Sequence, residues 1–121
     1  MSKKRVAAYR QGLWAEYVAA LFLFVRGYRI VAWRYKTRHG EVDLIASKGR
    51  TLVMLEVKRR QDKDTAFAAV TPRNQRRIEA AALQFLARNP KFMLYNVRFD
   101  VLAFSGLFSF AHLDNAWEAR S

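Results

Sequence analysis

Three acids and a lysine lie close together in one stretch of the sequence, and their types and spacing suit a site that binds a metal ion. Glu41 and Asp43 open one apolar segment, and Glu56 and Lys58 close the next one. Both segments are rich in β-branched and aliphatic residues, with Lys-Gly between them. We therefore expect an antiparallel hairpin over residues 40–60.

The register of this hairpin decides whether the acids meet. If Ser47 pairs with Leu52, Asp43 faces Glu56 across the two strands. Side chains alternate between the faces of a strand, so all four charged side chains then share one face, at the end away from the turn. The opposite face of the first strand carries only apolar side chains, those of Val42, Leu44 and Ala46.

Two facing carboxylates repel each other unless a positive charge compensates them. A divalent cation is one candidate, and the Lys58 ammonium is the other. Mg²⁺ binds oxygen ligands, retains several waters and takes one or two protein carboxylates together with substrate phosphate oxygens. Asp43 and Glu56 fit that demand. The alternative is structural: inward-pointing charges protect an edge strand from aggregation, and Glu56 pairs with Lys58.

The composition favours one globular domain over residues 1–121 and a partner that is a polyanion. The chain is 52% hydrophobic and has no cysteine, which excludes disulfides and thiolate zinc sites and suits the cytoplasm. Its net charge is +12, and most of its basic residues are arginines, whose planar guanidinium binds phosphate oxygens in pairs. Nucleic acid is the first expected partner and an anionic membrane surface the second. No apolar run reaches the roughly 20 residues of a membrane span.

The elements that must position the acids follow from periodicity. After a basic arm at residues 1–5, apolar residues recur at helical spacing from about Val6 to Val25, and Gly27 is placed to end that helix. Glu16 lies at the margin of its apolar face, where it either reaches a neighbouring site or pairs with Arg10 or another base. Residues 28–36 are expected to form a strand.

The second half of the chain contributes a helix and two more strands. A polar loop is expected up to Ala69. Thr71 is then the N-cap and Pro72 the first residue of a helix that ends at Asn89-Pro90. Its buried stripe consists of Ile78, Ala81, Ala82 and Phe85. Strands are expected at residues 91–104 and 107–111, followed by a tail at 112–121.

Basic side chains surround the acidic cluster in the sequence, and we expect several of them to contact a nucleic-acid backbone. His39, in the turn before the hairpin, is a general base, a phosphate contact or a solvated bystander. Cations in the first turns of a helix are disfavoured by the helix dipole, so an external anion is expected to compensate those near residue 75. The candidate contacts are Arg38, His39, Arg59, Arg60, Arg73, Arg76 and Arg77.

Several sequence blocks resemble the YraN-like family of predicted endonucleases. They are Gly12-x-x-x-Glu16, Gly27-Tyr28, Gly40-Glu41-Val42-Asp43-Leu44-Ile45-Ala46, Glu56-Val57-Lys58-x-Arg60, Thr71-Pro72 and Arg98-Phe99-Asp100-Val101. That family is similar to archaeal Holliday-junction resolvases of the PD-(D/E)xK nuclease superfamily. The chain departs from its pattern at Asn74, where a lysine is usual, and at Arg34, where an asparagine is frequent.

The resemblance implies an α/β fold with a restriction-endonuclease-like αβββαβ core, in which helices flank a mixed sheet. It also implies that Asp43 and Glu56 bind Mg²⁺ or Mn²⁺, that Lys58 is catalytic, and that Glu16 faces the metal. Glu41 is expected in or just behind the metal's coordination sphere. By analogy with resolvases, which need paired sites, the chain would form a homodimer.

Three hypotheses follow for the function. The first is a Mg²⁺-dependent endonuclease acting on DNA, including branched DNA or repair intermediates. The second is a basic nucleic-acid-binding protein that retains the nuclease fold without catalysis. The third is a peripheral membrane protein that uses its basic, aromatic first helix.

Overall fold

The computed structural model describes residues 3–60, 62–105 and 109–119, and it describes the side chains of the first helix from Trp14 onward. The helices are α1 (Lys3–Val25), α2 (Lys63–Ala68) and α3 (Pro72–Arg88), with a 3₁₀ turn η1 at Pro90–Phe92. The strands are β1 (Arg29–Lys36), β2 (Glu41–Lys48), β3 (Thr51–Arg59), β4 (Asn96–Phe104) and β5 (Phe110–Trp117).

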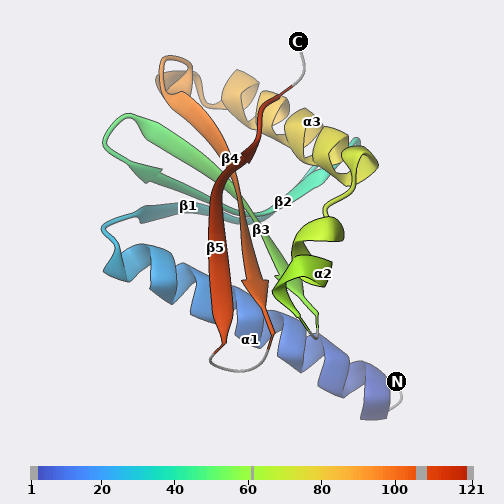
Figure 1. The fold of residues 1–121 in the computed structure, drawn as a ribbon. Helices are drawn as coiled ribbons and strands as arrows, with labels where there is room; N and C mark the ends of the chain where they lie inside the picture. The colour runs from blue at the N-terminus through green and yellow to red at the C-terminus, as the bar shows by residue number, and fades with distance from the viewer. Residues whose placement is uncertain (1–2, 61, 106–108, 120–121) are drawn as a thin grey trace.

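The five strands form one mixed sheet in the order β1-β2-β3-β4-β5. The β3–β4 pair is parallel, because the chain crosses over through α2 and α3, and the other three pairs are antiparallel. The helix α1 lies on one face of the sheet, and α3 lies on the other (Figure 1). The expected α/β class is therefore confirmed, and the arrangement is consistent with a restriction-endonuclease-like core.

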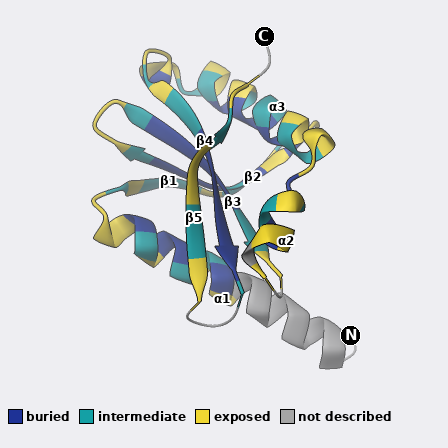
Figure 2. Cartoon of the chain, in the orientation of Figure 1, coloured by how far each residue is buried: buried dark blue, intermediate teal, exposed yellow. Residues whose placement is uncertain are grey.

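Apolar residues on each face of the sheet bury a separate core. On the α3 side the largest buried side chains include Ile45, Met54 and Ile78, and on the α1 side they include Leu44 and Leu55. The central strands β3 and β4 are buried along most of their length (Figure 2). This fits a strand covered by helices on both faces, which is apolar on both.

The hairpin has the expected register, with Ser47 opposite Leu52. The predicted face of Val42 is wrong, however. Val42 packs into the α3-side core, whereas Leu44 packs into the α1-side core. The neighbouring strand β1 is irregular at the same level, where Arg34 has a positive φ of 45°. The alternation shifts there, so that Tyr35, the partner of Val42, lies on the α3 side.

The start and the buried stripe of α3 are also confirmed. The Thr71 side chain accepts a hydrogen bond from the Asn74 backbone N–H, and Pro72 occupies the first turn. An N-cap of this kind satisfies one of the backbone donors that a helix start leaves unpaired. The buried residues are Ile78, Ala81, Ala82 and Phe85.

Other boundaries differ from the expected ones. The polar loop contains α2, because Asp62 caps it by accepting from the Thr65 backbone N–H. The strand β4 begins at Asn96, since the chain first makes the turn η1, and α1 extends to Lys3 through the expected basic arm. Parts of these expectations concern Met1, Ser2, Leu107, Phe108, Arg120 and Ser121, which lie outside the described residues.

The expected tail at 112–121 is largely a strand, which is the main correction to the fold. The strand β5 runs from Phe110 to Trp117 and pairs with β4. Its sequence masks this, because Asp114 and Asn115 disfavour strands. Asn115 has a φ of 50°, and the register shifts near it. Among the described residues, no helix is long and apolar enough to cross a membrane.

Candidate active site

Asp43 and Glu56 come together where β2 and β3 begin to separate. The regular pairing of these strands ends at Leu44 and Leu55, one residue before the two acids. At this point the Val57 backbone N–H donates to Asp43 Oδ2 at 2.8 Å. The Asp43 carboxylate therefore takes the place of a backbone acceptor and is held at the end of the ladder.

The carboxyl group of Glu56 is buried beside Asp43. The pKa of Glu56 is raised to about 9, chiefly by burial and then by a hydrogen bond with Asp43 and the negative charge of Asp43. The nearby Lys58 charge acts in the opposite direction, and Glu41 adds a small upward contribution. At neutral pH the pair therefore holds a proton between its two carboxyl groups.

Lys58 is the cation nearest to this pair in the described part of the hairpin. Its Nζ lies 4.0 Å from Glu56 Oε2, at the limit of an ion pair. The side chain is partly exposed, whereas that of Glu56 is almost fully buried. Lys58 can therefore reach from Glu56 toward a ligand at the surface.

The other two candidate ligands, Glu16 and Glu41, have different surroundings from the pair. Glu16, on α1, accepts a hydrogen bond from Arg34 Nε at 2.6 Å. Glu41 is exposed at the start of β2. Within the described ranges, no three acidic or histidine side chains are grouped so that they could hold a metal ion. Asp43 and Glu56 thus form a pair rather than a larger cluster.

The chemistry of the pair fits a hard divalent cation. All of its donor atoms are oxygens, and Mg²⁺ commonly takes one or two protein carboxylates while waters and substrate oxygens complete its coordination. The pKa of Glu56 is raised chiefly by burial and then by Asp43, and a cation bound between the two carboxylates would oppose both effects. Asp43 and Glu56 would hold such an ion, and Glu41 and Glu16 remain predicted ligands from the sequence.

One glycine brings two of the basic segments together. A Cβ at Gly40 would lie 1.8 Å from the Arg77 backbone oxygen, so the turn before β2 and the first half of α3 are in backbone contact. Thr37 closes this turn by accepting from the His39 and Gly40 backbone N–H groups. The contact places the turn that carries Arg38 and His39 next to the arginines of α3. Arg38, His39, Arg73, Arg76 and Arg77 are all exposed.

The remaining basic candidates follow directly after the lysine. Arg59 ends β3 and Arg60 follows it, and both are exposed. The Arg60 backbone N–H donates to the Phe104 carbonyl at 3.0 Å, which holds this segment against the end of β4. These two arginines are therefore anchored one and two residues beyond Lys58.

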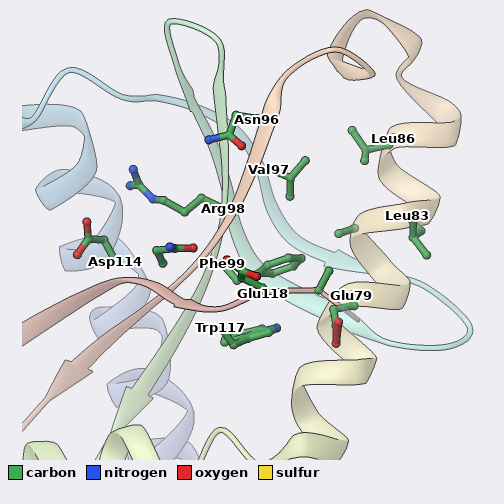
Figure 3. Close-up of a pocket in the computed structure, with 13 residues that line it drawn as sticks. Glu79, Leu83, Leu86, Asn96, Val97, Arg98, Phe99, Asp114, Trp117 and Glu118 are labelled. Carbon is green, nitrogen blue, oxygen red and sulfur yellow. The ribbon is translucent and has the colours of Figure 1, made fainter. Parts of the chain in front are cut away.

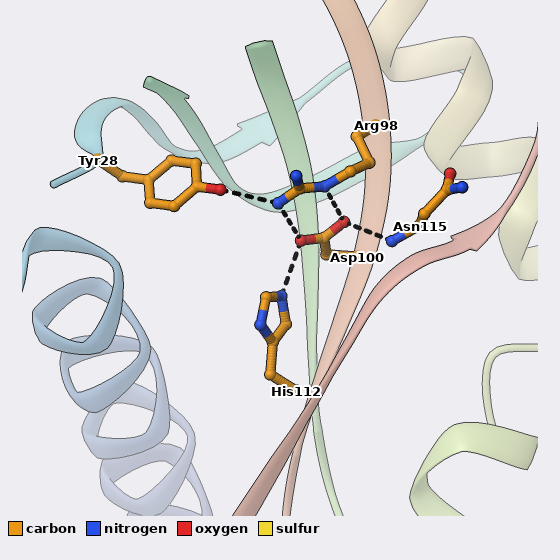
Figure 4. A network of polar contacts seen from close by, with 5 residues as sticks. All are labelled: Tyr28, Arg98, Asp100, His112 and Asn115. Carbon is orange, nitrogen blue, oxygen red and sulfur yellow. Dashed lines mark hydrogen bonds and ion pairs between the residues drawn. The ribbon is translucent and has the colours of Figure 1, made fainter. Parts of the chain in front are cut away.

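A second polar cluster surrounds Asp100, which is completely buried (Figure 4). Arg98 Nε and one of its terminal nitrogens each lie 2.9 Å from the Asp100 carboxylate, and the same nitrogen donates to the Tyr28 hydroxyl. His112 Nε2 lies 2.7 Å from Asp100 Oδ2, and the Asn115 backbone N–H donates to Oδ1. The cluster ties β4 to β5 and to the start of β1.

Burial alone would raise the pKa of Asp100, but the hydrogen bonds from His112, Arg98 and the Asn115 backbone outweigh it and lower that pKa. Hydrogen bonding to Asp100 in turn raises the pKa of Arg98. The sequence predicts no role for His112, because this residue lies in the expected tail. The signal available was the Arg98-x-Asp100 spacing, which puts both side chains on one face of a strand.

A separate pocket lies between α3 and the strands β4 and β5 (Figure 3). Its volume is about 680 Å³, and Leu83, Leu86, Phe99 and Trp117 supply much of its wall. None of the predicted site residues lines it. The candidate site is instead the carboxylate pair with Lys58 and the exposed arginines.

The fold and the site define a small basic α/β protein with a partly buried carboxylate pair at the end of a hairpin. Residues 15–104 match the model of the uncharacterised protein family UPF0102. The chain belongs to this family, the YraN-like family that its sequence blocks resemble.

Relatives from three bacteria match over most of their length. The chain is 47% identical over 112 residues to a UPF0102 protein of Parvibaculum lavamentivorans, which covers 93% of this chain and 84% of the relative. It is 45% identical over 115 residues to one of Rhodopseudomonas palustris, covering 95% and 88%. It is 46% identical over 101 residues to one of Bradyrhizobium diazoefficiens, covering 84% and 76%.

Proposed function

We propose that this protein is a divalent-cation-dependent endonuclease that hydrolyses phosphodiester bonds in DNA. The observation that carries the proposal is the Asp43–Glu56 pair, in which Glu56 is buried, with Lys58 beside it. A buried carboxylate whose pKa is raised to about 9 is expensive for the fold, and such groups gather at functional sites. The net charge of +12 supports a polyanionic substrate.

Each part of the site would have a distinct role. Asp43 and Glu56 would hold Mg²⁺ or Mn²⁺. When bound, such an ion supplies polarisation of the scissile phosphate and a water of lowered pKa. The Lys58 ammonium, 4.0 Å from Glu56, would stabilise charge that develops on the phosphate oxygens. The anchored Arg59 and Arg60 would hold the DNA backbone without reading its sequence.

The arginines of α3 and the turn at Arg38 and His39 would extend the same surface. Gly40 keeps these two segments in contact, so their charges add along one path. A phosphate bound near the first turns of α3 would also offset the repulsion between the arginines there and the helix dipole. The proposed substrate therefore spans from the carboxylate pair to the N-terminal part of α3.

Cleavage of a substrate panel tests the proposal. Supercoiled plasmid and linear, flapped and four-way DNA would each be incubated with Mg²⁺, with Mn²⁺ or with EDTA. We expect nicking only with a divalent ion, and we expect Asp43→Asn and Lys58→Met to lose it by about 100-fold or more while still binding DNA. Asp114→Asn, an exposed acid on β5, is the matched control and should cleave normally. Equal cleavage by Asp43→Asn would refute the site.

The second candidate function is a nucleic-acid-binding protein with no catalysis. Two observations favour it. Glu16 is paired with Arg34, and within the described ranges no third metal-binding side chain joins Asp43 and Glu56. In that case DNA binding would weaken steeply with salt, and no substrate of the panel would be cut with either metal. The same experiment therefore separates the two functions.

A further inference from the structure

The outer surface of α1 is a stripe of large apolar side chains with the spacing of a helix–helix contact. Trp14, Tyr17, Leu21 and Phe24 follow one another at intervals of three, four and three residues. Tyr17, Leu21 and Phe24 are 63%, 61% and 70% exposed, and Trp14 is exposed as well. A stripe with this narrow period is typical of the seam between two paired helices. We call these four residues the α1 seam.

The helix is also oriented in an unusual way on the sheet. Its buried side carries mostly small residues, Ala15, Ala19 and Ala20, with Leu23 as the large one. Val18 and Phe22 are partly buried against the same core, whereas the four residues of the α1 seam point to solvent. An ordinary surface helix does the reverse and buries its large residues. An exposed apolar patch of this kind marks an interaction site.

The seam is free of the charge that covers the rest of the molecule. Between Trp14 and Val25, Glu16 is the only charged residue in the sequence, and it is paired with Arg34. A nucleic acid bound along this part of α1 would contact no Lys or Arg between Trp14 and Val25. Two copies of a chain with net charge +12 repel each other over most approaches, whereas they can meet here without bringing like charges together.

The structure also provides a recess next to the seam. A hollow of about 430 Å³ is lined by Glu16, Tyr17, Trp33 and Arg34. The rings of Tyr17 and Trp33 lie 5.4 Å apart, so the wall of this hollow is aromatic. Aromatic anchors that fill such recesses dominate the energy of many interfaces.

We propose that the α1 seam is the interface of a homodimer, in which α1 of one copy packs against α1 of a second copy. The occupant must present an equally apolar and uncharged helix, and this chain presents one. An aromatic side chain buries about 150–250 Å² when it is fully covered. The exposed parts of the seam, Val25 and Trp33 therefore offer on the order of 600–700 Å² of surface per copy for burial. A stable interface needs roughly 800 Å² per partner, so the patch is close to the required size.

Charge favours antiparallel packing about a two-fold axis. Lys3, Lys4 and Arg5 lie at one end of α1, and parallel helices would place the two basic ends side by side. In the antiparallel arrangement Trp14 of one copy lies opposite Phe24 of the other, and Tyr17 lies opposite Leu21. Such an interface is closed, because each copy uses the same patch.

Sedimentation equilibrium of the full chain tests the interface without using any activity. We expect twice the 14.1 kDa mass of the chain at micromolar concentration. Leu21→Glu should raise the dissociation constant by about 30-fold or more, as the loss of a central anchor does. Leu83→Glu is the matched control, because Leu83 is 69% exposed on α3 and lies outside the seam. A wild-type monomer at 100 μM, about a hundredfold above a dissociation constant of 1 μM, would overturn the proposal. Binding of that monomer to vesicles of anionic and neutral lipid would identify a membrane as the occupant instead.

Disulfide trapping tests the orientation, because the chain has no cysteine of its own. Trp14→Cys and Phe24→Cys would be purified singly, mixed and oxidised. We expect the mixed disulfide between the two variants and little of either symmetric one. Symmetric disulfides alone would overturn the antiparallel arrangement, and random trapping equal to that of Leu83→Cys would overturn the interface. Circular dichroism of each variant shows whether it is folded.

Discussion

Replacing Glu56 with glutamine should make the protein more stable at neutral pH while destroying the candidate site. The native carboxyl group has a pKa raised to about 9, against an ordinary value of 4.5, chiefly because it is buried. Between these two values the native state keeps a proton that the unfolded chain releases. Unfolding is therefore favoured by rising pH. The stability that belongs to the protonated form is complete below pH 4.5 and is lost as the pH rises toward 9.

The size of the effect follows from the shift. One pH unit within this window corresponds to about 1.4 kcal/mol, so wild type should lose about 2–3 kcal/mol relative to Glu56→Gln between pH 5.5 and 7.5. Glutamine keeps the shape of the side chain and can donate a hydrogen bond to Asp43. It carries no titrating group, so its stability should lack this contribution.

Urea denaturation at pH 5.5, 6.5 and 7.5 measures the difference. Comparing the two proteins at each pH removes the titration of all other groups, which they share. Glu118→Gln, an exposed acid near the C-terminus, is the control and should run parallel to wild type. If Glu56→Gln also runs parallel to wild type, the carboxyl group is ionised in the native state, and the account of the pair is wrong.

Three further predictions concern the site and its supports. At pH 7.5, millimolar Mg²⁺ should raise the melting temperature of wild type but not of Asp43→Asn, because a ligand that binds only the native state stabilises that state. Scanning fluorimetry measures the two melting temperatures. Equal shifts in the two proteins would contradict the prediction. Gly40→Ala should lower the unfolding free energy by about 2–3 kcal/mol, since its Cβ would meet the Arg77 backbone oxygen at 1.8 Å. An unchanged midpoint of urea denaturation would mean that the two segments can move apart at no cost in stability. Asp100→Asn should cost about 3 kcal/mol at pH 7 by leaving Arg98 without its buried partner. Because the pKa of Asp100 is lowered, that deficit should shrink as the pH falls through the lowered value, and a deficit constant down to pH 2 would argue against it.

The hairpin is a part of the fold that the sequence alone predicts. The β-branched segments, the Lys48-Gly49 turn and strand alternation predict the pairing of Ser47 with Leu52, and the structure has it. That register is what brings Asp43 toward Glu56. The start of α3 at Thr71 is equally local, since a hydroxyl N-cap followed by proline needs no tertiary contact.

The face of Val42 and the role of the last segment could not be predicted in the same way. Val42 pairs with Tyr35 of β1, and Arg34, the residue before Tyr35, has a left-handed backbone conformation. The strand β5 contains Asp114 and Asn115, and local propensity argues against it. It forms because β4 offers an open edge and because buried Asp100 takes hydrogen bonds from it.

By itself, the sequence determined the periodic elements, the basic charge and the convergence of two acids across one hairpin, because each depends on neighbours a few residues apart. The tertiary structure alone decided that Glu16 pairs with Arg34, that Gly40 lies against α3, and that the four residues of the α1 seam face outward. These features depend on which surfaces meet when distant segments pack. A pattern of apolar residues indicates that a surface is buried, but it does not identify the segment that packs against that surface.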